Sequence, residues 1–207
     1  MTRLEQAYPL GDLNVPGANL RTVEFFRTSG CRRYAEIGVY KGHTALEIAG
    51  VLGGEGEMHL FDFDDRLSPV MEALAAAGHA NVIAHPNSRR LMDSYNWSLM
   101  ELLAEHREPV FDYVFLDGAH TWALDALAFL LVDRLLAPGG YVDFDDYPWT
   151  IARSPSMGPD VFPDIRRLYT DEQITRPQVA LVVDLLVRRD PAYTEVVADK
   201  VFQKTAA

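Results

Sequence analysis

Three aspartates directly follow two apolar runs of the chain, in positions where they could hold a divalent cation. Asp117 comes after the run 111–116, and Asp145 and Asp146 come after the run 141–144. If the two runs are neighbouring parallel strands, their carboxyl ends meet at one edge of a sheet and the three carboxylates converge. Hard oxygen ligands of this kind select Mg²⁺, Ca²⁺ or Mn²⁺, which would relieve the mutual repulsion. In the alternative interpretation, Asp117 alone contacts a ligand, and Asp145 and Asp146 cap the next segment.

A histidine beside this cluster could move a proton. His120 follows Asp117 by three residues, and an imidazole with an ordinary pKa of ~6.5 is an effective general base near neutral pH. Asp117 and the metal itself are the rival candidates for that role. Asp143 shares a strand face with Asp145, so it either supports a metal ligand or lies at a solvated strand end. His43 is a further pocket candidate, whereas no partner pattern surrounds His59, His79, His85 or His106.

A glycine turn precedes these residues in the chain. The string 34–44 reads Tyr-Ala-Glu-Ile-Gly-Val-Tyr-Lys-Gly-His-Thr and places Gly38 and Gly42 where a strand passes into a helix. Glycine lets a backbone approach a ligand without a side-chain clash, although structural glycines are also common at such turns. Asp62 follows Gly42 by about twenty residues, at the end of the next predicted strand, where a carboxylate can bind ribose hydroxyls. Its other interpretation is a turn that, with Asp64 and Asp65, starts the following helix.

Short apolar runs alternate with stretches of helical period, which is typical of parallel strands joined by crossover helices. The pattern predicts strands at 34–39, 57–63, 82–84, 111–116 and 141–144, and helices at 41–52, 69–77, 89–106 and 120–136, with a further helix at 19–29 in an N-terminal helical segment 1–30. Repeated prolines mark 147–162 as a loop, within a segment 147–170 that we expect to form a lid or acceptor wall with Trp149, Arg153 and Met157. A helix at 179–187 behind the capping-box pair Thr170 and Gln173, and a hairpin at 193–205 that turns at Asp199 and Lys200, complete the prediction.

Composition limits the class of protein. The chain has 207 residues, 48% of them hydrophobic and 24% charged, which suits a single globular domain spanning 1–207. Its formal charge of −11 repels polyanions, so nucleic acid is not an expected partner. The single cysteine, Cys31, excludes an intramolecular disulfide, and no apolar run approaches the ~20 residues that span a bilayer. We therefore expect a cytoplasmic protein with no membrane partner, and a homodimer stays open.

Three motifs resemble those of class I S-adenosylmethionine-dependent methyltransferases. They are Glu36-Ile-Gly-Val-Tyr-Lys-Gly42, Phe115-Leu-Asp-Gly-Ala-His120 and Pro138-Gly-Gly-Tyr-Val-Asp-Phe-Asp-Asp146, and they lie within residues 34–147. The chain is most similar to bacterial metal-dependent O-methyltransferases of small molecules, including those acting on sugars of antibiotics. Together with the strand pattern, the resemblance implies an α/β fold: a Rossmann-like three-layer sandwich with a mostly parallel sheet and a C-terminal antiparallel hairpin.

The resemblance also implies a set of ligand contacts. Glu36 and Gly38 would lie near the methionine part of S-adenosylmethionine, Asp62 would bind its ribose, and Gly42 and Asp117 would also line the cofactor. Asn87 and Ser88, after the third strand, would lie beside adenine. The chain departs from the family pattern in Gly-Val-Tyr-Lys-Gly, which lacks a denser glycine triplet, and in Pro86-Asn87, where relatives often have Gly-Asp.

The implied reaction is attack by a small-molecule hydroxyl on the sulfonium methyl group. By the same resemblance, Asp117, Asp145 and Asp146 would bind Mg²⁺, which would orient the hydroxyl and lower its pKa. Two other functions remain. A nicotinamide-dependent oxidoreductase could use a glycine turn and a strand-end acid, but the compact glycine fingerprint is absent and the aspartate cluster would have no role. A non-catalytic S-adenosylmethionine-binding protein would leave the aspartates and His120 unexplained.

Overall fold

The computed structural model describes residues 17–205, and within them a seven-stranded sheet forms the centre of the molecule. The strands follow the spatial order β3-β2-β1-β4-β5-β7-β6. Their bounds are Arg33–Ile37 (β1), Glu57–Phe63 (β2), Val82–Asn87 (β3), Phe111–Leu116 (β4), Leu136–Phe144 (β5), Tyr193–Val197 (β6) and Val201–Lys204 (β7). The pairs among β1 to β5 are parallel, whereas β7 is antiparallel to both β5 and β6. The predicted fold class is therefore confirmed, including the C-terminal hairpin.

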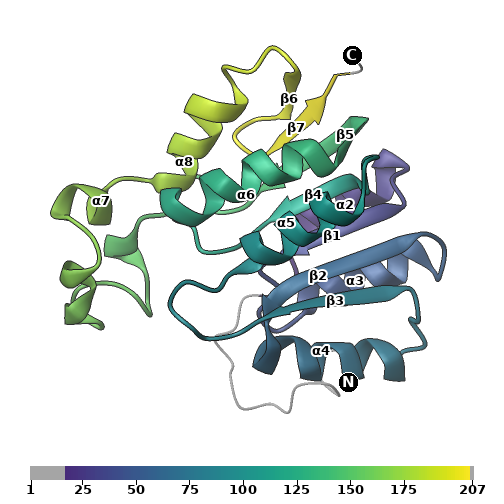
Figure 1. Ribbon diagram of the computed structural model, residues 1–207, viewed down its shortest axis with the longest axis horizontal. Helices are drawn as coiled ribbons and strands as arrows, with labels where there is room; N and C mark the ends of the chain where they lie inside the picture. The colour runs from purple at the N-terminus through teal and green to yellow at the C-terminus, as the bar shows by residue number, and fades with distance from the viewer. Residues whose placement is uncertain (1–16, 206–207) are drawn as a thin grey trace.

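Helices cover both faces of the sheet (Figure 1). They are α2 (Leu20–Ser29), α3 (His43–Leu52), α4 (Asp64–Ala76), α5 (Tyr95–Glu105), α6 (Trp122–Leu135), α7 (Asp171–Thr175) and α8 (Gln178–Val182), the last continuing as the π-helical turn η3 (Val183–Val187). One core cluster packs β4 and β5 against α5, α6 and α8, and a second packs β1 and β4 against α2, α3 and α4. In β4, Val114 and Leu116 belong to the first cluster, and Tyr113 and Phe115 to the second. This alternation explains why the strand reads as a continuous apolar run.

The first described helix, predicted at 19–29, is capped at both ends. The Asn19 side chain accepts a hydrogen bond from the backbone N–H of Thr22, and Gly30 ends α2 in the left-handed conformation.

Two other helices begin elsewhere than predicted. α4 starts at Asp64 rather than at Pro69, which lies inside the helix, because Asp64 and Asp65 occupy a first turn where acidic side chains are favourable. α5 starts at Tyr95, six residues later than predicted, because Ser94 caps it and the preceding residues form a separate turn.

The C-terminal third differs from the predicted elements in two further places. The capping box of Thr170 and Gln173 is present, but it starts the five-residue helix α7, and Pro177 separates that helix from α8. β5 begins at Leu136 rather than at Tyr141. Its register against β4 shifts around Gly139 and Gly140. The hairpin itself forms as predicted, and its turn contains Asp199 in the left-handed conformation.

Segment 147–170 is irregular, as its prolines predict, but it forms an apolar cluster together with α7. Ile151, Ile165 and Ile174 are buried together, and Trp149 and Met157 pack against them. Two short 3-10 helices, η1 (Ile151–Arg153) and η2 (Pro163–Arg167), lie in this stretch. A long loop with its own cluster can hold a defined position over neighbouring residues.

Among residues 17–205, no helix combines the length and the apolar character needed to cross a lipid bilayer.

Candidate active site

The glycine turn packs directly against the end of β4. The sheet order reverses between β1 and β4, so the loops that follow these two strands meet at the switch point of the sheet. Gly38 has a φ of +90°, and a Cβ at this position would lie 2.0 Å from the backbone oxygen of Asp117. Gly42, with a φ of +74°, would place a Cβ 2.6 Å from the Val70 side chain. The turn therefore requires both glycines for packing within the chain, whether or not a ligand approaches it.

Asp62 holds the glycine turn in place. Its Oδ2 accepts hydrogen bonds from the backbone N–H groups of Val39 at 2.9 Å and Tyr40 at 2.7 Å. Its Oδ1 accepts the N–H of Phe63 at 2.7 Å, and the side chain is 5% exposed. The structure thus adds an anchoring role that sequence reasoning did not foresee, and ribose binding by Asp62 stays a prediction.

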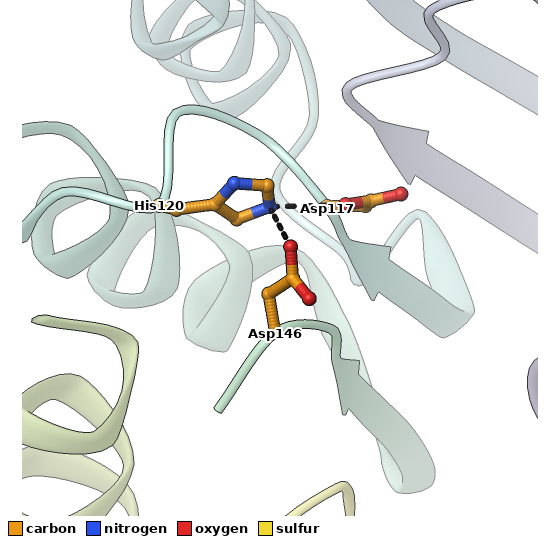
Figure 2. Close-up of side chains that lie close together, drawn as sticks. All are labelled: Asp117, His120 and Asp146. Atoms are coloured by element: carbon orange, nitrogen blue, oxygen red, sulfur yellow. Dashed lines mark hydrogen bonds and ion pairs between the residues drawn. The ribbon is translucent and has the colours of Figure 1, made fainter. Parts of the chain in front are cut away.

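Asp117, His120 and Asp146 converge beyond the ends of β4 and β5 (Figure 2). The His120 Nε2 lies 3.0 Å from Asp117 Oδ1 and 3.8 Å from Asp146 Oδ2. One ligand atom from each of the three side chains lies within 4.8 Å of the others. Two carboxylates and an imidazole form a donor set that fits a divalent cation.

Two members of this cluster have a left-handed backbone. The φ of His120 is +56° and that of Asp146 is +57°. For residues other than glycine this conformation costs roughly 1–2 kcal/mol, and it persists only where the surroundings enforce it. Two of the four non-glycine residues with this conformation among the described residues thus belong to the donor cluster, and the other two are Tyr40 in the glycine turn and Asp199 in the hairpin turn. Functional sites commonly store such strain.

Charge within the cluster is not balanced by the chain alone. Burial raises the pKa of Asp117 to about 6, with a further contribution from Asp145. Burial also raises the pKa of Asp146. For His120, burial opposes the charged form, but the hydrogen bond and charge of Asp117 outweigh it and raise the pKa of the imidazole. These shifts all favour the protonated forms of the three side chains, and a bound divalent cation could take the place of the protons.

Asp145 has partners outside this cluster. Its Oδ1 accepts a hydrogen bond from Asn19 Nδ2 at 2.9 Å and lies 3.7 Å from Lys200 Nζ. Lys200 Nζ also forms a 2.8 Å ion pair with Asp143, which is fully buried and accepts a hydrogen bond from the Tyr113 hydroxyl at 2.7 Å. The alternative prediction that Asp143 lies at a solvated strand end is therefore wrong. Of the predicted aspartate trio, the structure brings together Asp117 and Asp146, while Asp145 faces Asn19 and Lys200.

The predicted cofactor residues lie at the same edge of the sheet. Glu36 is 1% exposed, and its Oε2 accepts a hydrogen bond from the Tyr34 hydroxyl at 3.0 Å. Burial, reinforced by Asp117 and Asp62, raises the Glu36 pKa well above its usual value. A buried carboxyl beside two further acids suits a ligand that carries positive charge, as a sulfonium does.

The end of β3 offers one unpaired acceptor. The Asn87 side chain is 6% exposed, and its Oδ1 has no hydrogen-bond partner among the described residues. A ligand with an amino donor, such as adenine, could satisfy it. Ser88 is less suited to that role, because its hydroxyl and its N–H both bond to Asp93 in an exposed turn.

The acceptor-wall residues differ in their positions. The Trp149 ring lies 5.2 Å, between centroids, from the His120 ring, so it borders the donor cluster. Met157 packs on the isoleucine cluster of segment 147–170, and Arg153 is exposed.

Several supporting residues were not found from the sequence. Tyr95 donates a hydrogen bond to Asp125 at 2.5 Å and accepts one from the N–H of Ala119, which supports the turn between Asp117 and His120. Asn19 carried only the signal of a helix cap, and Lys200 only that of a hairpin turn. Both act across more than fifty residues of chain.

Two of the remaining histidines have partners that the sequence did not predict. His59 lies between Glu57 and His85, with contacts of 2.6 and 2.8 Å, so the expectation that His59 and His85 have no partners is wrong. Glu57 and His59 lie on β2 and His85 lies on β3, all of them N-terminal to the strand ends that form the site. His43 is the first residue of α3, next to the glycine turn.

Comparisons with known proteins agree with the motifs. An O-methyltransferase from Bacillus cereus, solved with S-adenosylhomocysteine, has a TM-score of 0.68 and 16% identity, covering 100% of this chain and 91% of that one. The O-methyltransferase TomG from Streptomyces achromogenes, involved in tomaymycin synthesis and solved with S-adenosylmethionine, has a TM-score of 0.65 and 21% identity over the same shares. At these identities the likeness establishes the fold. No curated protein is significantly similar in sequence to the chain.

A family model described as a methyltransferase domain matches residues 35–147. This range contains the glycine turn, Asp62 and the donor cluster, and it nearly coincides with the region whose motifs resemble class I methyltransferases. Because the match spans more than half of the chain, the protein belongs to this family of methyltransferase domains.

Proposed function

We propose that the protein transfers a methyl group from S-adenosylmethionine to a hydroxyl group of a small molecule, with a divalent cation, Mg²⁺ above all, held at the donor cluster. The observation that carries this proposal is the convergence of Asp117, His120 and Asp146 beside the glycine turn. A site for the methyl donor and a site for activating a hydroxyl would then lie next to each other.

The acids at the strand ends support the choice of methyl donor. Besides burial, the charges of Asp117 and Asp62 both act on Glu36 and raise its pKa. They favour a ligand with a positive centre over a nicotinamide dinucleotide with its two phosphates. The structural neighbours from Bacillus cereus and Streptomyces achromogenes, solved with S-adenosylhomocysteine and S-adenosylmethionine, point the same way.

His120 is the proposed general base. Its Nε2 faces both carboxylates of the cluster. Asp117 orients the imidazole through the 3.0 Å contact and favours the imidazolium that forms when His120 takes the hydroxyl proton. A bound divalent cation would lower the pKa of that hydroxyl. Trp149 would cover one side of the reacting groups and exclude water.

Asp117 and Asp146 are the proposed metal ligands in this arrangement. Asp145 can join them through its Oδ2, because Asn19 and Lys200 contact only Oδ1. If Asp145 replaces His120 in the coordination sphere, the donor set is all oxygen and suits Mg²⁺, which leaves the imidazole free to act as the base.

The proposal also includes the chemical class of the acceptor and the cellular compartment. TomG, which takes part in tomaymycin synthesis, supports a natural-product or sugar hydroxyl as the acceptor class. The formal charge of −11 argues against a nucleic-acid acceptor. The buried free thiol of Cys31 agrees with a cytoplasmic protein.

Calorimetric titrations of the full chain with S-adenosylmethionine, nicotinamide cofactors and Mg²⁺ test this function, followed by a methyl-transfer assay on a panel of hydroxylated metabolites. We expect binding of S-adenosylmethionine and Mg²⁺ and turnover of at least one acceptor. His120→Gln should lower kcat and leave cofactor binding unchanged, and the control Asp164→Asn, at an exposed position of η2, should match the wild type. Cofactor binding without any methyl transfer would favour the non-catalytic alternative, and binding of a nicotinamide cofactor alone would refute the proposal.

A further inference from the structure

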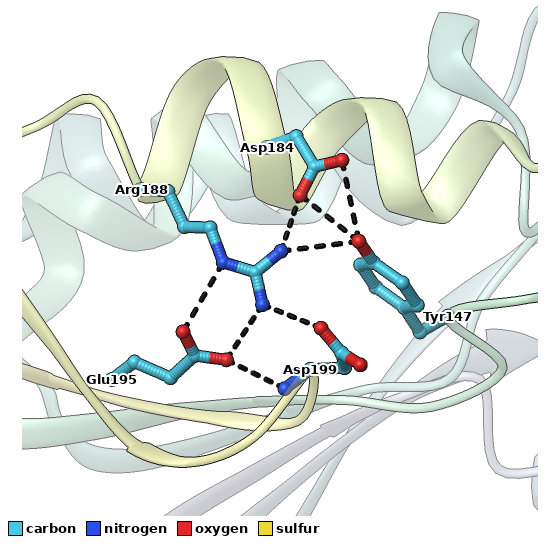
Figure 3. Close-up of polar contacts among 5 residues, drawn as sticks. All are labelled: Tyr147, Asp184, Arg188, Glu195 and Asp199. Atoms are coloured by element: carbon cyan, nitrogen blue, oxygen red, sulfur yellow. Dashed lines mark hydrogen bonds and ion pairs between the residues drawn. The ribbon is translucent and has the colours of Figure 1, made fainter.

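A cluster around Arg188 joins the C-terminal hairpin to the segment that follows Asp146 (Figure 3). Arg188 directly follows η3, and its guanidinium lies 2.6 Å from Glu195 of β6 and 2.5 Å from Asp199 in the hairpin turn. It also forms an ion pair with Asp184 one helical turn earlier. The guanidinium is therefore fixed by carboxylates from three separate parts of the fold.

Tyr147 connects this cluster to the donor site. Its hydroxyl accepts a hydrogen bond from Arg188 Nη1 at 3.1 Å and lies 3.0 Å from Asp184 Oδ1, to which it donates. The guanidinium carbon also lies 5.5 Å from the centroid of the Tyr147 ring. Figure 3 shows the hydroxyl directed at both partners, so the side chain of the residue after Asp146 is held at its polar end.

Asp146 depends on its neighbours for its conformation. Its φ of +57° is unfavourable for a residue with a side chain. On the preceding side, Asp145 is fixed by its backbone bond to Leu116 at 3.0 Å. On the following side, the Asp146 carbonyl accepts the N–H of Trp149 at 2.9 Å, and the Tyr147 side chain is held by Arg188 and Asp184. Release of Tyr147 would remove one of these restraints, so that Asp146 could relax toward a common backbone conformation and its carboxylate could move away from His120.

We propose that Arg188 and Tyr147 are positioning residues that hold Asp146 in place for cation binding, an inference that rests on the metal site proposed above. Neither residue touches the reacting groups. Their contribution passes through the backbone of residues 146 and 147, and the C-terminal hairpin thereby becomes part of the catalytic architecture rather than only a closure of the sheet edge.

The sign of the effect separates positioning from electrostatics. Arg188 is a cation, so its charge alone disfavours a second cation bound in its neighbourhood. If the charge were its whole influence, Arg188→Gln would strengthen Mn²⁺ binding. Positioning predicts the opposite, and it predicts the same direction for Tyr147→Phe, which changes no charge and keeps the ring.

The test compares Tyr147→Phe and Arg188→Gln with the wild type in the full chain. Mn²⁺ affinity is measured by electron paramagnetic resonance, and amide hydrogen exchange is measured for the peptide spanning 144–150. Both variants should weaken Mn²⁺ binding by roughly tenfold and speed exchange in that peptide. The matched control is Arg176→Gln, which breaks the exposed i,i+4 ion pair with Glu172 on α7 and should leave both readings unchanged.

The exchange reading does not require a metal, so it separates the two proposals. If the wild-type chain binds no Mn²⁺ while both variants speed exchange, the proposed metal site fails and the structural link through Tyr147 stands. Unchanged exchange in both variants overturns the positioning role whatever the metal does. Tighter Mn²⁺ binding by Arg188→Gln also overturns it, because Arg188 would then act through its charge alone.

Discussion

The indole of Trp149 lies against the imidazole of His120, with 5.2 Å between ring centroids and an angle of 54° between the ring planes. Trp149 belongs to the apolar cluster of segment 147–170, whereas His120 belongs to the turn after β4. The contact therefore places the cluster of that long segment beside the proposed base. We therefore expect an acceptor whose hydroxyl reaches His120 to contact the Trp149 ring as well.

Replacing Trp149 by Ala should raise the acceptor KM much more than the KM for S-adenosylmethionine. We expect the indole to line the acceptor side of the site because it packs against His120, whereas the predicted cofactor residues Glu36, Asp62 and Asn87 lie at the ends of β1, β2 and β3. Steady-state kinetics with each substrate varied in turn would measure the difference. Leu168→Ala is a suitable control, because Leu168 is in the same segment and 61% exposed. Equal changes in the two KM values would refute the assignment of Trp149 to the acceptor wall.

Substitution of Asp62 by Asn should weaken S-adenosylmethionine binding by roughly tenfold. The carboxylate accepts two backbone N–H groups from the glycine turn, and such charge-assisted hydrogen bonds are about twice as strong as neutral ones. Calorimetry with S-adenosylmethionine and with its 2′-deoxy analogue would separate two roles. If Asp62 acts only through the turn, the variant loses the same factor for both ligands, whereas ribose binding predicts a smaller loss for the analogue. The control is Asp65→Asn, at an exposed residue paired with Arg89.

The sequence was sufficient to predict the parts of the site that depend on single elements. β2 and β4 have the predicted bounds, so the positions of Asp62 and Asp117 at strand ends followed directly. An apolar run that is buried on both faces has few alternative structures, and the residue after it must lie at the sheet edge.

The choice among the neighbouring aspartates could not be made in this way. Asp145 and Asp146 are adjacent in sequence, and their different directions depend on Asn19, on Lys200 and on the left-handed backbone of Asp146. These are tertiary contacts with residues far away in the chain. The pairing of His59 with His85 was missed for the same reason, because it depends on the register between β2 and β3.

The His59 and His85 pair should make the protein less stable in acid. Burial, and next the neighbouring His59, lower the pKa of His85 to about 4, whereas the unfolded chain has an ordinary pKa of ~6.5. As the pH falls from 6.5 toward 4, the unfolded state therefore takes up a proton that the folded state does not, and the free energy of unfolding decreases. The effect is absent above pH 6.5 and complete below about pH 4.

His85→Gln should remove most of this dependence, worth about 1–2 kcal/mol once the partial exposure of His85 is allowed for. Urea unfolding at pH 7.5 and pH 4.5 measures it as the difference between the two free energies. His79→Gln, after the end of α4, serves as the control. An identical pH dependence in His85→Gln and the wild type would show that the pair does not control acid stability.

The ion pair of Lys200 and Asp143 should show strong coupling in a double-mutant cycle. Asp143 is fully buried and Lys200 is 6% exposed, with 2.8 Å between the charged atoms. Lys200→Met leaves a buried carboxylate without its cation, so we expect a loss of about 3–5 kcal/mol in the free energy of unfolding. Combining Lys200→Met with Asp143→Asn removes both charges and should restore part of that loss. Arg134→Met, which breaks an exposed pair with Asp133, should cost less than about 1 kcal/mol. Simple addition of the two single effects in the double variant would mean that the pair contributes no specific stability, and that Asp143 is held by its surroundings instead.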